Sequence, residues 1–97
     1  MPLDDILSTA HDIVHGDRND QYGDPIHDYT RVVEIFEVLT RIKITPEDGA
    51  LFMLAVKLAR LMSNHEINRT HRDSLVDAAG YLWVYGQIME AQGKTGI

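Results

Sequence analysis

Apolar side chains recur at helical spacing in four segments of the chain, with short polar stretches between them. A spacing of three or four residues places side chains on one face of an α-helix. In the first segment the apolar positions are Ile6, Leu7, Ala10, Ile13 and Val14. Gly16 follows directly, and glycine commonly ends helices. The pattern predicts an amphipathic first helix over residues 3–15.

The next two segments begin with clear helix-start signals. Asp24-Pro25 combines a favourable N-cap residue with proline in the first helical position, and apolar residues recur from there to Leu39. Thr45-Pro46-Glu47-Asp48 has the pattern of a capping box, in which the side chains at the N-cap and three residues later bond reciprocally to the backbone. We predict helices over residues 25–41 and 46–64.

The fourth segment follows a second capping-box pattern, Thr70 to Asp73, and ends near Gly93, which predicts a helix over residues 71–92. Its apolar residues cover almost the whole circumference, which is typical of a helix at the centre of a bundle or an oligomer. No segment has the alternating pattern of a strand. The sequence predicts one all-α domain, residues 1–97, with a four-helix bundle-like architecture.

Size and charge narrow the classes of partner. A chain of 97 residues builds only a modest core, so we expect a homo-oligomer, a dimer or larger. The net charge of −6 disfavours a nucleic acid or an anionic membrane as the main partner, since either would be repelled.

The sequence also indicates a cellular location. There is no cysteine, which excludes a disulfide framework and a zinc-thiolate site. The N-terminus lacks the charged-then-apolar run of a signal peptide, and no apolar segment reaches membrane-spanning length. We therefore expect a cytoplasmic protein.

Two pairs of charges stand at helical spacing on consecutive predicted helices. Lys57 and Arg60 share one helix face, and Asp73 and Asp77 share a face of the next helix. A carboxylate buried alone in an apolar helix costs several kcal/mol, so we expect Asp77 to pair with Lys57 or Arg60. A structural ion-pair network and a ligand site both fit this pattern. Asp73 also fits the role of a capping-box acid.

The stretch from Gly16 to Asp24 has the composition of a loop. Arg18, Asn19 and Tyr22 within it suit either a base or phosphate ligand or the docking of the loop onto the helices, and both interpretations stay open. Tyr81, on the Asp77 side of the last helix, is either a core aromatic or a stacking partner for a nucleobase.

The strings RNDQYGDP (residues 18–25), KLAR (57–60) and DSLVDAAGY (73–81) carry a family resemblance. Together they resemble a group of small phage and prophage MazG-like proteins of undefined function. That group is related to the all-α nucleoside triphosphate pyrophosphohydrolases of the MazG superfamily. In active members, as the resemblance implies, an E-x-x-E on one helix and an E-x-x-D on the next hold magnesium ions that carry the triphosphate.

This chain departs from that metal-binding pattern. Lys57 and Arg60 occupy the positions of the first two glutamates, Ser74 occupies the position of the third carboxylate, and only Asp77 matches. Cations repel magnesium, so we expect no ordinary metal site, and Lys57 and Arg60 can hold phosphate directly instead.

Another E-x-x-E, formed by Glu34 and Glu37, offers an alternative register in which these residues meet Asp73 and Asp77 across the bundle. Arg31 and Arg41 flank the two glutamates at helical spacing, however, which favours a solvent-exposed face with pairs along the helix.

The sequence thus predicts a protein that binds a nucleotide or another small phosphate compound, and it assigns no cofactor to this binding. Lys57 and Arg60 would hold the phosphate, Asp77 would orient them, Arg18 and Tyr22 would close the site, and Tyr81 would contact the base.

Two alternatives remain open. One is a magnesium-dependent nucleoside triphosphate pyrophosphohydrolase, with Asp77 and Asp73 as catalytic residues and Glu34 and Glu37 as further metal ligands. The other is a non-enzymatic oligomerisation or interaction protein of phage or prophage origin.

Overall fold

The computed structural model describes residues 2–16 and 23–94, and in this part of the chain four helices are joined by irregular connections, without a strand. The prediction of an all-α chain is confirmed, and each helix begins and ends within two residues of its predicted bounds. None of the described helices combines the length and apolar character needed to cross a lipid bilayer. The helices are α1 (Leu3–His15), α3 (Pro25–Thr40), α4 (Pro46–Glu66) and α5 (Arg72–Ala91).

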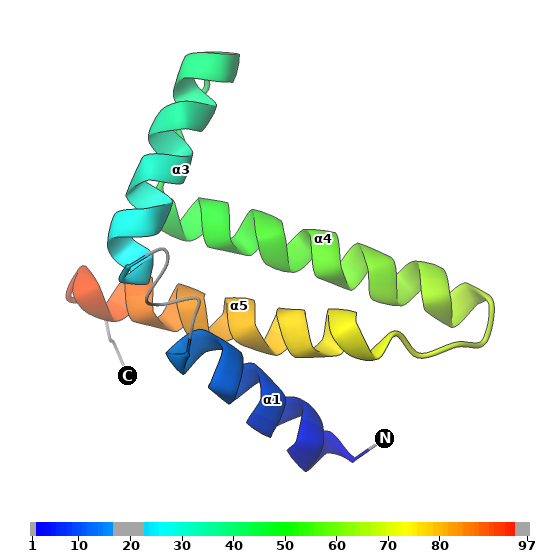
Figure 1. Ribbon diagram of the computed structural model, residues 1–97. Coiled ribbons are helices and arrows are strands. Elements are labelled where there is room, and N and C mark those ends of the chain that lie inside the picture. Colours follow the sequence, from blue (N-terminus) through cyan, green and yellow to red (C-terminus); the bar gives the residue numbers. More distant parts are fainter. Residues whose placement is uncertain (1, 17–22, 95–97) are drawn as a thin grey trace.

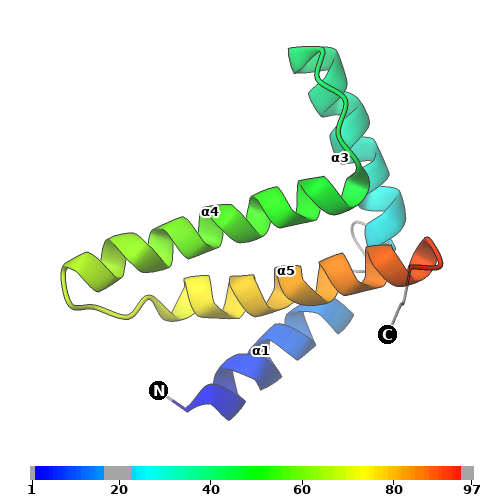
Figure 2. The same cartoon turned by 180° about the vertical axis from the view of Figure 1, so that it is seen from behind.

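Helices α4 and α5 form an antiparallel hairpin, and α1 packs on the side of α5 that faces away from α4 (Figure 1). Helix α3 crosses the end of the hairpin where α4 begins and α5 ends, and its C-terminal half projects beyond it (Figure 2). The arrangement is therefore more open than a bundle of four aligned helices. Helix α5 contacts all three other described helices, as its apolar circumference predicts.

The core has two parts, one on each side of α5. Tyr29 of α3 and Ala50 of α4 pack against one side of α5, and Ile6 and Ala10 of α1 pack near Val76 on another. The first cluster is completed by Tyr81, Val84 and Ile88. The crossing of α3 over α4 is close because Gly49 has no side chain: a Cβ there would lie 3.1 Å from Val33 Cγ1 and 3.2 Å from Tyr29 Cδ1.

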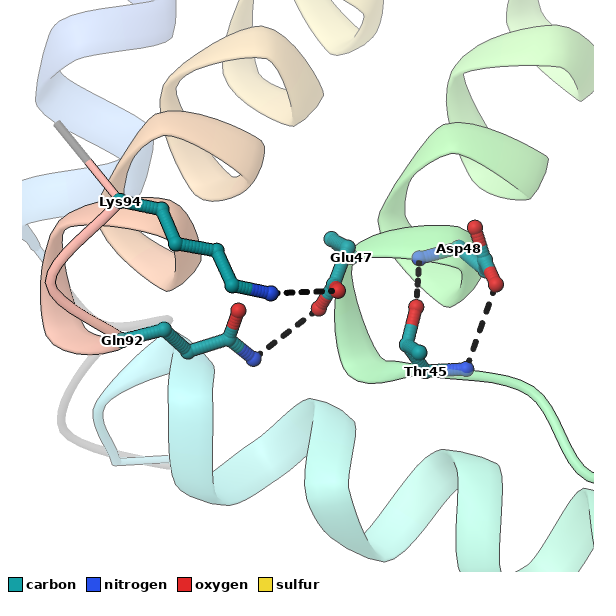
Figure 3. A network of polar contacts seen from close by, with 5 residues as sticks. All are labelled: Thr45, Glu47, Asp48, Gln92 and Lys94. Carbon is teal, nitrogen blue, oxygen red and sulfur yellow. Dashed lines mark hydrogen bonds and ion pairs between the residues drawn. The ribbon is translucent and has the colours of Figure 1, made fainter. Parts of the chain in front are cut away.

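The helix-start predictions were right at two positions and wrong at one. Asp24 is the N-cap of α3 with Pro25 at the first helical position. Thr45 forms the predicted capping box: its Oγ1 accepts from the Asp48 N–H at 3.2 Å, and Asp48 Oδ2 accepts from the Thr45 N–H at 3.3 Å (Figure 3).

The capping box predicted at Thr70 does not form, because α5 begins one residue later with His71 as its N-cap. This shift moves Asp73 from the third to the second helical position, where it is exposed to solvent. The ring of His71 instead contacts the hydroxyl of Ser74, which is fully buried.

A polar network ties the start of α4 to the end of α5 (Figure 3). Gln92 Nε2 donates to Glu47 Oε2 at 3.0 Å, and Lys94 Nζ lies 3.5 Å from Glu47 Oε1. Burial raises the pKa of Glu47, but hydrogen bonds from its own backbone N–H, Gln92 and Thr45, together with the Lys94 charge, outweigh burial and leave the pKa below its ordinary value. The network therefore favours the ionised carboxylate in the folded chain.

Alanine substitutions at two helical glycines should have opposite effects on stability. Gly49→Ala adds a methyl group between the buried side chains of Val33 and Tyr29, and overpacking of this kind typically costs about 1–3 kcal/mol. Gly86→Ala meets no atom within 4 Å, so only the better helix propensity of alanine acts, which contributes up to about 1 kcal/mol. Urea unfolding should show Gly49→Ala less stable and Gly86→Ala more stable than the parent. A stabilised Gly49→Ala would contradict the close crossing of α3 over α4.

The stabilisation by Glu47 should depend on pH. Its pKa is lower in the folded state than in the unfolded state, so its contribution is full above the ordinary glutamate pKa and is lost as the pH falls through the folded pKa. Glu47→Gln should therefore reduce the free energy of unfolding at neutral pH, and the difference from the parent should shrink on acidification. Unfolding curves at several pH values test this, with the exposed Glu90→Gln as the matched control. An equal loss at all pH values would sink the prediction.

Candidate functional site

The hairpin brings together one cation and one carboxylate of the predicted charge cluster. Lys57 Nζ of α4 lies 2.8 Å from Asp77 Oδ2 of α5. The side chain of Lys57 is only 13% exposed, whereas that of Asp77 is 39% exposed. Lys57 therefore lies in the interface between the helices, and Asp77 reaches solvent from its edge. This pair confirms the expectation that Asp77 finds a cationic partner on the preceding helix.

The other two members of the cluster do not join this pair. The antiparallel register brings Arg60 to the level of Asp73, one turn nearer the connection between α4 and α5. Both side chains are exposed, and within the described ranges neither forms an ion pair. The backbone carbonyl of Arg60 accepts a hydrogen bond from Asn64 Nδ2 at 2.9 Å. The exposed Arg60 therefore lies one turn from the Lys57–Asp77 pair.

Tyr81 belongs to the core and does not line an open binding site. It is 9% exposed and packs in the cluster that joins α3, α4 and α5. Of the two interpretations of this residue, the structure fits the core aromatic, and little of the ring is left for a nucleobase to cover.

The predicted loop residues Arg18, Asn19 and Tyr22 lie outside the described residues. The residues that follow the loop, Asp24 and Pro25, line a cavity of about 330 Å³ together with Trp83 and Gln87 of α5. Along α5 these residues are six and ten positions from Asp77, so this end of the loop joins the fold at a different part of α5 from the charge cluster.

The four carboxylates of the alternative metal site do not come together. Glu34 and Glu37 are exposed on α3, which meets the hairpin where α4 begins, whereas Asp73 lies in the first turn of α5 at the other end. Among the described residues there is no group of three or more histidine, aspartate or glutamate side chains placed to hold a metal ion. Arg31 pairs along the helix with Asp28 at 3.5 Å. Arg41 ends α3 in the left-handed conformation and forms no ion pair with Glu37, contrary to the predicted pairing.

Several polar contacts were not predicted from the sequence. Arg72 donates to Asp5 Oδ2 at 2.8 Å and to Thr9 Oγ1 at 3.0 Å, which fastens α1 to the start of α5. The edge-on contact of the His15 ring with Trp83, at 4.9 Å between centroids, fastens the other end of α1. The partners in each contact are more than 60 residues apart along the chain, so no local spacing predicts these contacts. Only the contact of Ser74 with His71 had a signal in the sequence, because a hydroxyl within an apolar helix needs a polar partner.

Comparisons with known proteins place the chain in a family. A family model described as a domain of unknown function, DUF6378, matches residues 5–89, and the chain therefore belongs to this family. No solved structure matches the chain. The matched range includes α3, α4 and nearly all of α1 and α5, so the charge cluster lies within the family domain.

Two phage proteins are among the similar sequences. The Gene 55 protein of Mycobacterium phage L5 is 39% identical over 80 residues, which are 81% of this chain and 49% of that protein. The Gene 55 protein of Mycobacterium phage D29 is 33% identical over 85 residues, which are 88% of this chain and 54% of that protein. The chain spans about half the length of the curated relatives it matches. The resemblance to phage proteins of undefined function is thereby confirmed, and the wider relation to MazG enzymes stays a prediction.

The two members of the ion pair should contribute unequally to stability. Asp77→Ala leaves the Lys57 ammonium almost buried without a partner, and an unsatisfied buried polar group typically costs about 1–3 kcal/mol. Lys57→Met keeps an apolar stem in the interface and leaves Asp77, which solvent already reaches, to be hydrated. Chemical denaturation should therefore show a larger loss for Asp77→Ala than for Lys57→Met. The reverse order would contradict the assigned burial of the pair.

Proposed function

We propose that this chain binds a nucleotide or another small phosphate compound at the face of the α4–α5 hairpin that carries Lys57, Arg60 and Asp77. The observation that carries the proposal is the exposed Arg60, which pairs with no carboxylate among the described residues and lies one turn from a lysine already held in place. Two cations one turn apart on one helix face suit the several oxygens of a phosphate group.

The three side chains have different roles in this proposal. The planar guanidinium of Arg60 offers two parallel N–H donors to one phosphate group. Asp77 holds the Lys57 ammonium 2.8 Å away and so limits its rotamers before the ligand arrives. Because Lys57 is already neutralised by Asp77, Arg60 supplies most of the net attraction for an anion. The affinity of the site should therefore depend more on Arg60 than on Lys57.

Hydrolysis is a second form of the same proposal. Magnesium is often bound by one or two carboxylates together with phosphate oxygens of the substrate, and Asp73 and Asp77 lie one turn apart on α5. In a pyrophosphohydrolase these two residues would hold the metal ion, which would ready a water molecule for attack on the nucleoside triphosphate. The exposed Asp73 is the observation that favours this form.

A non-enzymatic interaction protein is the candidate from a different class. Large apolar side chains are exposed on several helices, among them Phe52, Leu58 and Met62 of α4 and Leu82 of α5. Exposed apolar side chains are typical of contact surfaces where they gather into a patch. Self-association and phosphate binding use different side chains here, so one does not exclude the other.

Thermal-shift measurements with inorganic phosphate and nucleoside mono-, di- and triphosphates, with and without magnesium, test the proposal. A ligand at 100 times its Kd adds about 2.7 kcal/mol of stability, which is readily detected as a rise in Tm. Arg60→Ala should weaken binding about tenfold or more, because a hydrogen bond to a charged group contributes about 1.5–3 kcal/mol. The matched control is Arg69→Ala, an exposed arginine in the connection after α4.

The outcomes separate the candidates. A shift without magnesium that Arg60→Ala abolishes and Arg69→Ala retains supports phosphate binding. A shift that requires magnesium and is followed by pyrophosphate release from a nucleoside triphosphate supports the hydrolase. Absence of any shift, or a shift that both arginine variants retain, would refute a phosphate site at Arg60 and leave the interaction protein.

A further inference from the structure

A cavity of about 330 Å³ lies where α1 ends and α3 begins, against the C-terminal half of α5. Pockets for small organic molecules typically have volumes of about 300 Å³ and above. The cavity is called the Trp83 cavity below, after one of its four polar side chains, which are those of His15, Asp24, Trp83 and Gln87. No residue of the charge cluster is among the described residues that line it. The Trp83 cavity is therefore separate from the phosphate site proposed above.

The polar side chains of the Trp83 cavity have hydrogen-bonding capacity that no described residue uses. Asp24 caps α3 with its backbone carbonyl, which accepts from the N–H groups of His27 and Asp28 at 3.0 Å each. Its carboxylate forms no capping hydrogen bond. Between described residues, that carboxylate, the side-chain amide of Gln87 and the indole N–H of Trp83 form no hydrogen bond or ion pair. A few polar groups that converge on a hollow in this way are typical of a ligand pocket.

The electrostatics of the Trp83 cavity favour a positive ligand. Asp24 contributes a full negative charge, and no lysine or arginine is among the residues that the structure places on the wall. Two helices end at the cavity, α1 at His15 and α5 at Ala91, whereas only α3 begins there. A helix C-terminus carries about half a negative charge and an N-terminus about half a positive charge, so the three helix ends together add to the negative potential. An anion would be repelled from this cavity.

The indole ring of Trp83 restricts the kind of cation that fits. Tryptophan is the aromatic side chain that attracts cations most strongly, and the planar guanidinium group also stacks on aromatic rings. A guanidinium group presents two parallel N–H donors that match the two oxygens of a carboxylate such as that of Asp24. Calcium and magnesium require several oxygen ligands instead. In the part of the chain that the structure describes, no group of three or more acidic or histidine side chains is placed to hold a metal ion.

We propose that the Trp83 cavity binds the guanidinium group of a small organic compound. The guanidinium group donates two hydrogen bonds to the Asp24 carboxylate and lies against the Trp83 ring. The amide oxygen of Gln87 accepts a further N–H of the ligand. The charge of this ligand is opposite to that of the phosphate proposed for the hairpin, and the side chains are different. Either proposal can therefore fail without the other.

Tryptophan fluorescence of the full chain tests the binding, because Trp83 is the single tryptophan and reports on this cavity alone. Butylguanidinium is the probe, and butylurea, which has a similar planar group without the charge, is the matched ligand control. The titration is done at pH 8, where an imidazole group is normally neutral, and at constant ionic strength. Butylguanidinium should change the emission in a saturable way, and butylurea should not.

Acetyl-arginine amide presents the same guanidinium group as an arginine side chain of a protein would. Weaker binding of acetyl-arginine amide than of butylguanidinium supports a free small compound as the ligand. Tighter binding would overturn that choice in favour of an arginine side chain of a partner protein.

Two variants of the cavity test the assigned contacts. Asp24→Asn should weaken the binding of butylguanidinium about tenfold or more, because it removes the charge that strengthens both hydrogen bonds. Asparagine caps helices as well as aspartate does, so α3 should keep its start. The matched control Asp4→Asn makes the same change of net charge at an exposed position in the first turn of α1, and it should leave the binding unchanged. Gln87→Glu adds a second carboxylate to the cavity and should tighten the binding severalfold, which keeps the proposal testable if Asp24→Asn unfolds the chain.

Three further outcomes would overturn the proposal. The first is that millimolar butylguanidinium causes neither a change in emission nor a heat of binding in calorimetry. The second is that butylurea binds as tightly as butylguanidinium. The third is that Asp24→Asn and Asp4→Asn have the same effect on the affinity.

Discussion

Burial of α5 between α1 on one side and α3 and α4 on the other is the constraint on which the rest of the structure depends. Helix α5 has apolar residues around nearly all of its circumference, and these three helices cover much of it. A buried polar group on such a helix needs a polar or charged partner. Asp77 finds Lys57, and Ser74 finds His71 in the turn before it. The position of the candidate site is therefore a consequence of how the core is covered.

The Lys57–Asp77 pair links this structural requirement to function. A pair in which the lysine is almost buried and the carboxylate half-exposed fixes the register of α4 against α5 and presents charge at the hairpin surface. Arg60 adds a second cation, with which no carboxylate pairs in the part of the chain that the structure describes. An interpretation of the cluster as purely structural accounts for the inner pair and leaves Arg60 without a role. That difference is why the proposed phosphate site is centred on Arg60.

The family is described as one of unknown function and implies no substrate, so the chain's own surfaces are the guide to its chemistry. Two surfaces are chemically distinct. The hairpin carries the charge cluster, and the C-terminal half of α3 exposes large apolar side chains, among them Val38 and Leu39.

The sequence by itself determined the features that depend on near neighbours. Periodicity and turn residues predicted all four described helices, and the capping box at Thr45 followed from residues three apart. The Lys57–Asp77 pair could also be predicted, because a short connection makes α4 and α5 antiparallel neighbours. The prediction of a capping box at Thr70 was wrong. Thr70 and His71 are both possible N-cap positions by local sequence, and in the structure His71 is the N-cap and its ring contacts Ser74.

Only the tertiary structure decided contacts between residues that are distant along the chain. The contact of Glu47 with Gln92 and that of Asp5 with Arg72 depend on which helix ends meet, and no local spacing encodes that choice. The crossing direction of α3 is set by the close approach at Gly49 and by the space around Tyr29 and Val33. Periodicity identifies which face of a helix is apolar, but the shapes of the packed surfaces decide which partner covers it and at what angle.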